Sequence, residues 1–291
     1  TPKPSSAASD VYKRQVINFC LNAFFLFVLH KGVAGVATAT VISRIINLVI
    51  VVLLGAVLVK AKQHPERESN RAVMGQIIRI GLPSACETAI YNVSMTLVIR
   101  FLNQMDAQGL NVTARSYTMQ ITNFSYCVGA ALAQANAIMT GWHIGAKEYD
   151  ACDRGTKKAA VIGVIVAVIL ETVFTLCSGW IMQLFSKDPQ MVSLVGKLLA
   201  IDIVLEIGRV TNLVYGQALK TSGDAVFPVV MGACFMILCS VGGTYLFGIR
   251  LGLLAVGAYI GMTGDECVRA VGMYLRWKSG KWKEKGLVKS R

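Results

Sequence analysis

Eight apolar stretches follow one another along this chain, with only short polar joints between them. A helix needs roughly 20 mostly apolar residues to cross a bilayer. Seven stretches reach that length and an eighth is shorter; in chain order they are 16–29 (the short one), 33–60, 72–102, 111–139, 158–185, 191–219, 226–247 and 253–277. The pattern predicts a polytopic membrane protein that has the lipid bilayer as its surroundings.

The composition supports the same conclusion. Hydrophobic residues make up 54% of the 291 residues and charged residues only 15%, and the mean hydropathy is +0.56. This leaves too little polar surface for a soluble globule. Ten-residue segments of alternating polarity, the mark of a membrane barrel, do not occur, so the spans are expected to be helices. The predicted fold class is all-α, a transmembrane helix bundle.

The basic residues are unevenly distributed among the joints. Seventeen lie in the second, fourth and sixth joints and the C-terminal tail: Lys60, Lys62, Arg67, Arg71, Arg79, Lys147, Arg154, Lys157, Lys158, Lys220, Arg276, Lys278, Lys281, Lys283, Lys285, Lys289 and Arg291. Six lie in or near the odd joints: Lys31, Arg100, Arg115, Lys187, Lys197 and Arg250. The positive-inside rule then places the even joints and the C-terminus in the cytoplasm of a multi-pass cell-membrane protein.

The net charge of +13 would suggest nucleic acid as a partner for a soluble chain. Here the basic clusters lack interleaved aromatics on an independent domain, so we expect no nucleic-acid binding. Seven of the eight cysteines lie inside apolar spans and no C-x-x-C pair occurs. They are interpreted as packing residues, and no metal site is expected.

The first 15 residues differ from the rest. They read TPKPSSAASDVYKRQ, a polar run without an initiator Met that stops against the apolar Val16. Its last nine residues, AASDVYKRQ, resemble a translated sequencing-adapter remnant, and we interpret 1–15 as a non-native or disordered tail.

A repeat links the two ends of the chain. The pattern L-F-x-x-H-x-G-V-x-x-V at 26–36 recurs as L-F-x-x-R-x-G-L-x-x-V at 246–256, an offset of 220 residues. Internal repeats of this kind mark the halves of transporters. If the first two stretches repeat as the seventh and eighth, four further helices are expected before residue 16, so the N-terminal part of the bundle is predicted to be missing.

Four segments carry a resemblance to a known family. They are G-V-A-G-V-A-T-A-T-V-I-S-R at 32–44, I-G-L-P at 80–83, M-T-G with G-A-K at 139–147, and A-L-K-T-S-G-D at 218–224. Together they resemble the multidrug and toxic compound extrusion (MATE) family of cation-coupled efflux transporters. The resemblance implies helices five to twelve of twelve, with 16–60 as the last two helices of the N-terminal lobe. A cytoplasmic linker (61–75), a six-helix C-terminal lobe (76–277) and a basic cytoplasmic tail (278–291) follow.

The sixth stretch holds the strongest candidate site. Charges within a span are costly, so each is a functional hypothesis by default. Asp202, Glu206, Arg209 and Gln217 recur at steps that fall on one stripe of a helix. Glu206 and Arg209, three residues apart, can pair directly. The pair is either a strut of the bundle or a switch whose proton affinity changes as the two groups move.

Other stretches supply further candidates. Glu87 and Tyr91 follow Pro83 by one and two turns, where a bent helix gives a cation a nearby polar backbone. Gln120 and Asn123 belong to an uncharged polar stripe that either bonds to other helices or forms a cavity wall. The last stretch holds Asp265, Glu266 and Arg269.

A secondary transporter is the leading functional hypothesis. No G-x-x-x-x-G-K-[ST] motif occurs, so the energy is expected from a gradient of H⁺ or Na⁺ as the coupling ion, with no other cofactor. The resemblance implies export of drugs or small organic cations by alternating access, and a monomer at full length. A lipid-linked precursor flippase of the same superfamily is the alternative. A membrane-embedded enzyme is a distant one, because H-E-x-x-H and G-x-S-x-G are both absent.

Overall fold

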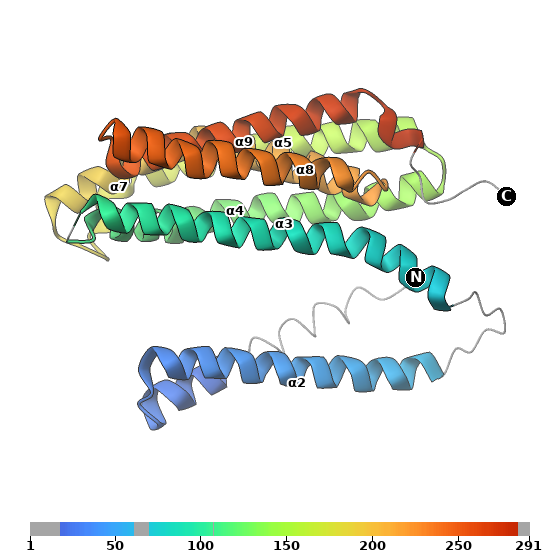
Figure 1. The fold of residues 1–291 in the computed structure, drawn as a ribbon, viewed down its shortest axis with the longest axis horizontal. Helices are drawn as coiled ribbons and strands as arrows, with labels where there is room; N and C mark the ends of the chain where they lie inside the picture. The colour runs from blue at the N-terminus through green and yellow to red at the C-terminus, as the bar shows by residue number, and fades with distance from the viewer. Residues whose placement is uncertain (1–17, 61–69, 107, 285–291) are drawn as a thin grey trace. The chain divides into compact units, whose positions relative to one another are not determined.

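The computed structural model describes residues 18–60, 70–106 and 108–284 (Figure 1). The chain divides into two compact units, Thr1–Asn70 and Arg71–Arg291. The predicted tail 1–15, most of the predicted linker 61–75 and the end of the predicted basic tail lie outside the described residues.

The first unit contains two helices joined by a tight turn. The helix Asn18–Val28 ends in the π-helical turn η1 (Phe24–Val28), and α2 (Gly32–Lys60) follows. His30 and Gly32 have φ of 49° and 54°, so the turn uses the left-handed region at both positions. Asn18 Nδ2 donates a hydrogen bond of 3.1 Å to Ser43 Oγ. The helices predicted at 16–29 and 33–60 are therefore both present.

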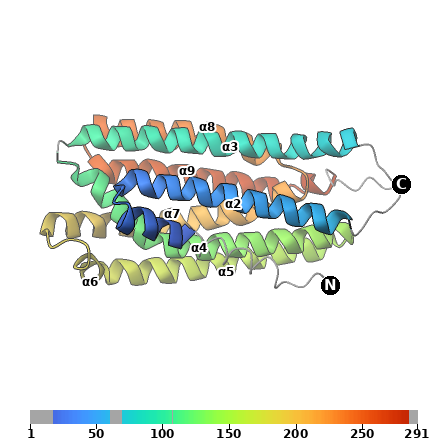
Figure 2. The ribbon, with the colours of Figure 1, turned by 90° about the horizontal axis from the view of Figure 1, so that it is seen from below.

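The second unit is a helix bundle built around α7. Its elements are α3 (Asn70–Met105), α4 (Leu110–Gly145), α5 (Tyr149–Leu176), the short α6 (Ser178–Met182), α7 (Pro189–Thr221), α8 (Val226–Phe235), η2 (Met236–Val241), η3 (Thr244–Arg250), α9 (Leu254–Lys278) and the 3₁₀ turn η4 (Lys281–Glu284). α7 packs most extensively against α9, α4 and α5 (Figure 2). The described part of the chain contains no strand, and the predicted all-α fold is confirmed.

Helix boundaries follow the predicted stretches closely, with one difference. The stretch expected at 158–185 begins earlier, at Tyr149, and breaks after Leu176 into the separate α6. The first turns of α5 are polar, so a search for apolar length does not see them. α7 begins where local chemistry requires it: the Asp188 side chain accepts from Gln190 N at 3.0 Å, and Pro189 occupies the first turn.

Two of the described helices, Tyr149–Leu176 and the continuous α8–η3 segment Val226–Arg250, are long and apolar enough to cross a membrane by length and composition alone. α7 is as long, yet it carries Asp202 and Glu206 at mid-length. Both side chains are buried inside the bundle, 2% and 0% exposed. The polar residues of α7 therefore face other helices, as expected for a charged span in a membrane protein.

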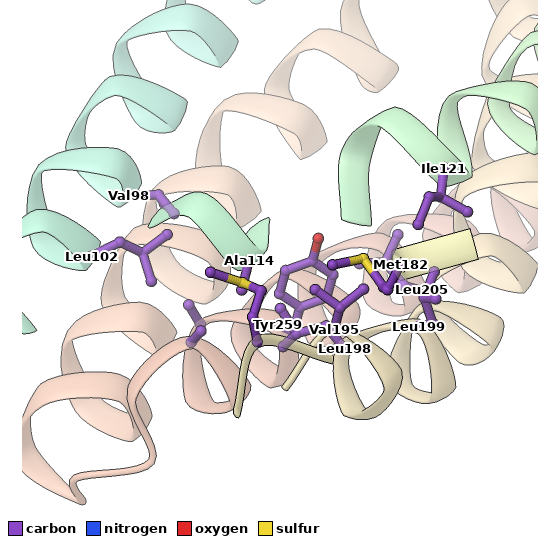
Figure 3. Close-up of a cluster of buried hydrophobic side chains, with 13 residues drawn as sticks. Val98, Leu102, Ala114, Ile121, Met182, Val195, Leu198, Leu199, Leu205 and Tyr259 are labelled. Atoms are coloured by element: carbon purple, nitrogen blue, oxygen red, sulfur yellow. The ribbon is translucent and has the colours of Figure 1, made fainter. Parts of the chain in front are cut away.

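The apolar core of the second unit forms two clusters along α7. Figure 3 shows the first, whose members include Val98 and Leu102 of α3, Leu198 and Leu199 of α7, and Tyr259 of α9. The second cluster surrounds the later turns of α7, and its members include Val210, Val214, Tyr215, Trp277 and Trp282. Glu206 and Arg209 of α7 lie between the α7 residues of these two clusters.

The basic joints lie at one end of this bundle. Trp277 Nε1 donates to Asp153 Oδ1 at 2.9 Å, and Arg276 Nε donates to Asp224 Oδ2 at 2.7 Å. These bonds join the end of α9 to the α5 start and to the joint after α7. The tail begins by folding back, with Trp282 stacked on Trp277 at 4.2 Å. That this end faces the cytoplasm stays a prediction.

Candidate functional site

Two adjoining cavities open beside the charged stripe of α7. The larger has a volume of about 500 Å³ and the smaller about 230 Å³. Both are lined by Tyr91 of α3, Tyr126 of α4, Arg209 of α7 and Glu266 of α9. Pro228 of α8 also lines the larger cavity. Five helices, α3, α4, α7, α8 and α9, thus contribute to one polar region within the second unit.

A glycine contact sets the distance between α7 and α9 at this level. A Cβ added to Gly208 would lie 2.9 Å from Cys267 N and from Glu266 C, so the two backbones touch. Small residues at such crossings allow membrane helices to approach closely. The contact brings Arg209, the next residue of α7, beside the Glu266 side chain.

Five charged side chains form an ionic chain across α7 and α9. Arg209 Nη1 lies 3.3 Å from Glu206 Oε1, and Arg209 Nε lies 3.9 Å from Glu266 Oε1. Arg269 Nη2 lies 2.8 Å from the same Glu266 oxygen, while Arg269 Nε lies 2.8 Å from Asp265 Oδ1. Charges alternate along the chain, with three carboxylates for two guanidinium groups.

Two neutral side chains hold the carboxylates of α9 in place. Asn212 Nδ2 donates to Glu266 Oε2 at 3.0 Å, and Ser240 Oγ donates to Asp265 Oδ2 at 2.9 Å. Such partners reduce the cost of burying charge. The Arg209–Glu266 contact of 3.9 Å is the longest in the chain, and we expect it to open first.

A second ion pair crosses the larger cavity from α7 to α3. Lys220 Nζ lies 2.6 Å from Glu87 Oε2, with the side chains 23% and 19% exposed. Glu87 also contacts α8, because a Cβ added to Gly232 would lie 3.5 Å from its Oε1. The carboxylate of Glu87 is thus placed at the meeting point of three helices.

Several buried polar atoms have no hydrogen-bond partner within the described ranges. They include Asp202 Oδ2, Glu206 Oε2, Arg115 Nε and both carboxylate oxygens of Glu171. Asp202 and Arg115 line the smaller cavity. Among the described residues, no group of three or more His, Cys, Asp or Glu side chains is arranged to hold a metal ion.

The structure gathers most of the predicted site residues. Those lining the larger cavity are Glu87, Tyr91, Arg209, Glu266 and Arg269, and those lining the smaller one include Asn123 and Asp265. Glu206 is completely buried and lines neither cavity; it reaches them through Arg209. Gln120 is exposed and is not part of either lining. The predicted Glu206–Arg209 contact is present.

Four further residues of the site were not singled out from the sequence. Asn212 stands one turn beyond Arg209, and the spacing of the charged stripe could have pointed to it. Lys220 was interpreted as a sign of membrane orientation and as part of the family segment 218–224, and Arg115 as a sign of orientation alone. Ser240 carries no local signal, since its importance depends on α9 lying opposite.

The fold and the cavities define a class, a helical membrane-protein bundle with a polar site in its interior. Residues 83–246 match the MatE family, and the chain belongs to it. It is 34% identical to "Uncharacterized transporter YisQ" of Bacillus subtilis, over 94% of this chain and 61% of that protein. It is 22% identical to "Probable multidrug resistance protein NorM" of Pasteurella multocida, over 90% of this chain and 59% of that protein.

Solved structures show the same fold. The eukaryotic MATE transporter AtDTX14 superposes with a TM-score of 0.80 at 18% identity, covering 95% of this chain and 62% of that one. A MATE protein in the straight conformation gives 0.76 at 19% identity, covering 93% and 62%. The chain thus spans about three fifths of the length of the relatives it matches.

Proposed function

We propose that the protein is an antiporter that exports drugs or organic cations by alternating access, in exchange for H⁺ or Na⁺. The observation that carries the proposal is the ionic chain from Glu206 to Asp265 beside a cavity of about 500 Å³. Its carboxylates outnumber its guanidinium groups, which favours a cation as the further partner.

The Arg209–Glu266 contact, which is the longest in the ionic chain, suggests how one cation could replace another at the site. Glu266 is shared by Arg209, Arg269 and Asn212, and it keeps 14% of its side chain exposed. A cationic ligand that reaches Glu266 competes with Arg209, whose contact of 3.9 Å is the longest. Displaced Arg209 then pairs with Glu206 alone. A ligand that prefers one arrangement shifts the population between the two.

A lipid-linked precursor flippase is the second candidate. A pyrophosphate headgroup needs cations that are free to bind it, whereas Arg209, Arg269 and Lys220 each contact a carboxylate. The one observation that favours a flippase is Arg115, whose Nε has no partner among the described side chains.

Transport by the full-length protein in liposomes separates the candidates. We expect an imposed gradient of H⁺ or Na⁺ to drive the transport of ethidium, and we expect Glu266→Gln to abolish this transport. Glu148→Gln is the matched control, because Glu148 is 59% exposed outside the site. If a fluorescent lipid diphosphate moves between leaflets and ethidium does not, the antiporter proposal is wrong and the flippase takes its place.

A further inference from the structure

Glu171 is a buried carboxylate that the ionic chain does not use. It lies in α5 with 0% of its surface exposed, and neither oxygen has a hydrogen-bond partner in the described structure. The same face of α5 carries the buried small residues Ala160, Gly163 and Ala167, which lie one turn apart. Large aliphatic side chains cover the opposite face. Glu171 therefore points into the bundle.

Contacts at Val210 place Glu171 relative to its neighbours. A Cβ added to Gly129 of α4 or to Gly163 of α5 would lie 2.8 Å from a Val210 methyl group, so three helices meet there. Ser125 precedes Gly129 in α4 by one turn, Glu206 and Asp202 precede Val210 in α7 by one and two turns, and Glu171 follows Gly163 in the antiparallel α5 by two turns. The side chains at this level belong to one buried layer.

Among the described side chains, the charged groups that act on Glu171 belong to α7. Asp202 and Glu206 are close enough to oppose a negative charge on Glu171, and Arg209 to favour one. From α4 the polar neighbour is Ser125, which is 0% exposed and whose Oγ likewise has no hydrogen-bond partner among the described residues, and α6 has no charged residue. Arg209 is already engaged by Glu206 and Glu266. An ionised Glu171 would thus be a third buried anion next to one occupied cation.

Such an anion is costly. An ionised carboxylate without partners in a low-dielectric interior loses several kcal/mol of solvation, and like charges nearby add to the cost. A proton removes the charge and needs only one oxygen.

We propose that Glu171 is a proton-binding site of the second unit, separate from the ionic chain that runs from Glu206 to Asp265. In the conformation described, Glu171 holds a proton. Asp202 provides the exit. It lies on the face of α7 that also carries Glu206, its charge acts on Glu171, it lines the smaller cavity, and its Oδ2 has no hydrogen-bond partner among the described residues. The proton passes from the Glu171 carboxyl to the Asp202 carboxylate and then to water in the cavity. Movement of Arg209 toward Glu171 stabilises the anion that remains.

Infrared spectroscopy of the purified full-length protein in lipid tests the site directly. At neutral pH we expect a C=O stretching band of a protonated carboxylic acid that Glu171→Gln removes. Glu148→Gln, at an exposed position, should leave the band unchanged. Glu171→Asp keeps the carboxyl group and should shift the band, which covers the case in which Glu171→Gln fails to fold. A band unaffected by both substitutions, or absent from the unsubstituted protein, overturns the proposal.

The role of the released proton rests on the proposed antiport function, and transport tests it separately. We expect Glu171→Gln to retain ethidium binding and to lose transport driven by a pH gradient. Since the infrared readout does not require transport, a protein that shows the band yet transports nothing contradicts the antiporter proposal alone. Normal proton-driven transport by Glu171→Gln contradicts the role of Glu171 in coupling.

Discussion

Lys220 Nζ lies 2.6 Å from Glu87 Oε2 and joins the last turn of α7 to α3 across the larger cavity. The two residues are 133 positions apart in the sequence. Among the described side chains, a further polar contact of α3 with this bundle joins Arg115 Nη2 to Met95 Sδ at 3.6 Å. The Lys220–Glu87 pair is therefore in a position to control how far α3 stands from α7.

Breaking this pair should loosen α3. We expect Lys220→Met and Glu87→Gln each to lower the free energy of unfolding, with a coupling between them of about 1.5 to 3 kcal/mol, as for a hydrogen bond to a charged group. The lower end applies because both side chains remain about a fifth exposed. A double-mutant cycle measured by thermal unfolding gives the coupling. The more exposed Lys157–Asp153 pair is the control and should couple less; equal coupling would contradict this role.

The helices of this protein could be predicted from sequence because apolar length and helix boundaries depend on local residues. The seventh stretch, expected at 226–247, is the segment Val226–Arg250. The contact between Glu206 and Arg209 was also predictable, because helix geometry alone brings residues three apart together.

Contacts between helices depend on packing and could not be predicted. Neither the Lys220–Glu87 pair nor the Ser240–Asp265 bond follows from spacing along one helix. Glu171 was visible as a lone carboxylate in an apolar span, but its inward orientation depends on the small residues of α5 packing against α7. The joining of α7 to α9 depends on Gly208, which resembles any other glycine in the sequence.

The close approach of α7 and α9 at Gly208 can be tested by adding a methyl group at this position. Gly208→Ala should lower the free energy of unfolding by about 1 to 3 kcal/mol, because the new Cβ meets the α9 backbone, which cannot move aside without separating the helices. Gly264→Ala is the matched control in α9. Nothing lies within 4 Å of its Cβ, so the higher helix propensity of Ala should be neutral or stabilise by up to about 1 kcal/mol. Equal effects of the two changes would show that Gly208 is not a packing contact.

Asp106 should make the free energy of unfolding vary with pH in the acid range. It precedes α4 and accepts from Leu110 N at 2.9 Å and Asn111 N at 3.0 Å. Burial raises the pKa of Asp106, but the hydrogen bonds from Asn111 and Leu110 outweigh burial and hold the pKa below its ordinary value. The contribution of Asp106 to the free energy of unfolding is fully present above its pKa in the unfolded chain, about 3.9. It is lost as the pH falls through the lower pKa of the folded protein.

Removing Asp106 tests this. Asp106→Ala should cost about 0.5 to 2 kcal/mol at neutral pH, as for loss of a helix cap. The difference from the unsubstituted protein should shrink as pH is lowered below about 4. Chemical unfolding across the acid range measures both effects. A difference that does not decrease as the pH falls below about 4, where the unfolded chain takes up the proton, would contradict the assignment.

Membrane orientation remains to be measured. The basic joints lie at the end of the bundle where Arg276 contacts Asp224, and the positive-inside rule places this end in the cytoplasm. In a background without native cysteines, a membrane-impermeant thiol reagent should label a cysteine placed at Lys187 in intact cells. It should spare one placed at Lys147. The reverse pattern would invert the topology.

The Glu206–Arg209 pair is either a strut or a switch, and three variants separate these roles. Glu206 is completely buried and Arg209 is 24% exposed. Arg209→Met leaves the Glu206 carboxylate without its partner and should cost about 3 to 5 kcal/mol, unless the carboxylate takes up a proton. Glu206→Gln preserves size and hydrogen-bonding capacity, so it should fold normally. If Glu206 couples transport to the ion gradient, this variant loses the response of export to that gradient.

The double change of Glu206 and Arg209 to Gln decides between the two roles, because it removes both charges together. A strut recovers stability and transport in part, since no buried charge is left unpaired. A switch recovers stability and stays inactive, since no group remains to respond to the ion. Unfolding midpoints and ethidium export in liposomes, measured on the same preparations, provide both readouts. Export by Glu206→Gln with normal dependence on pH and Na⁺ would make Glu206 structural and transfer the coupling role to Glu87.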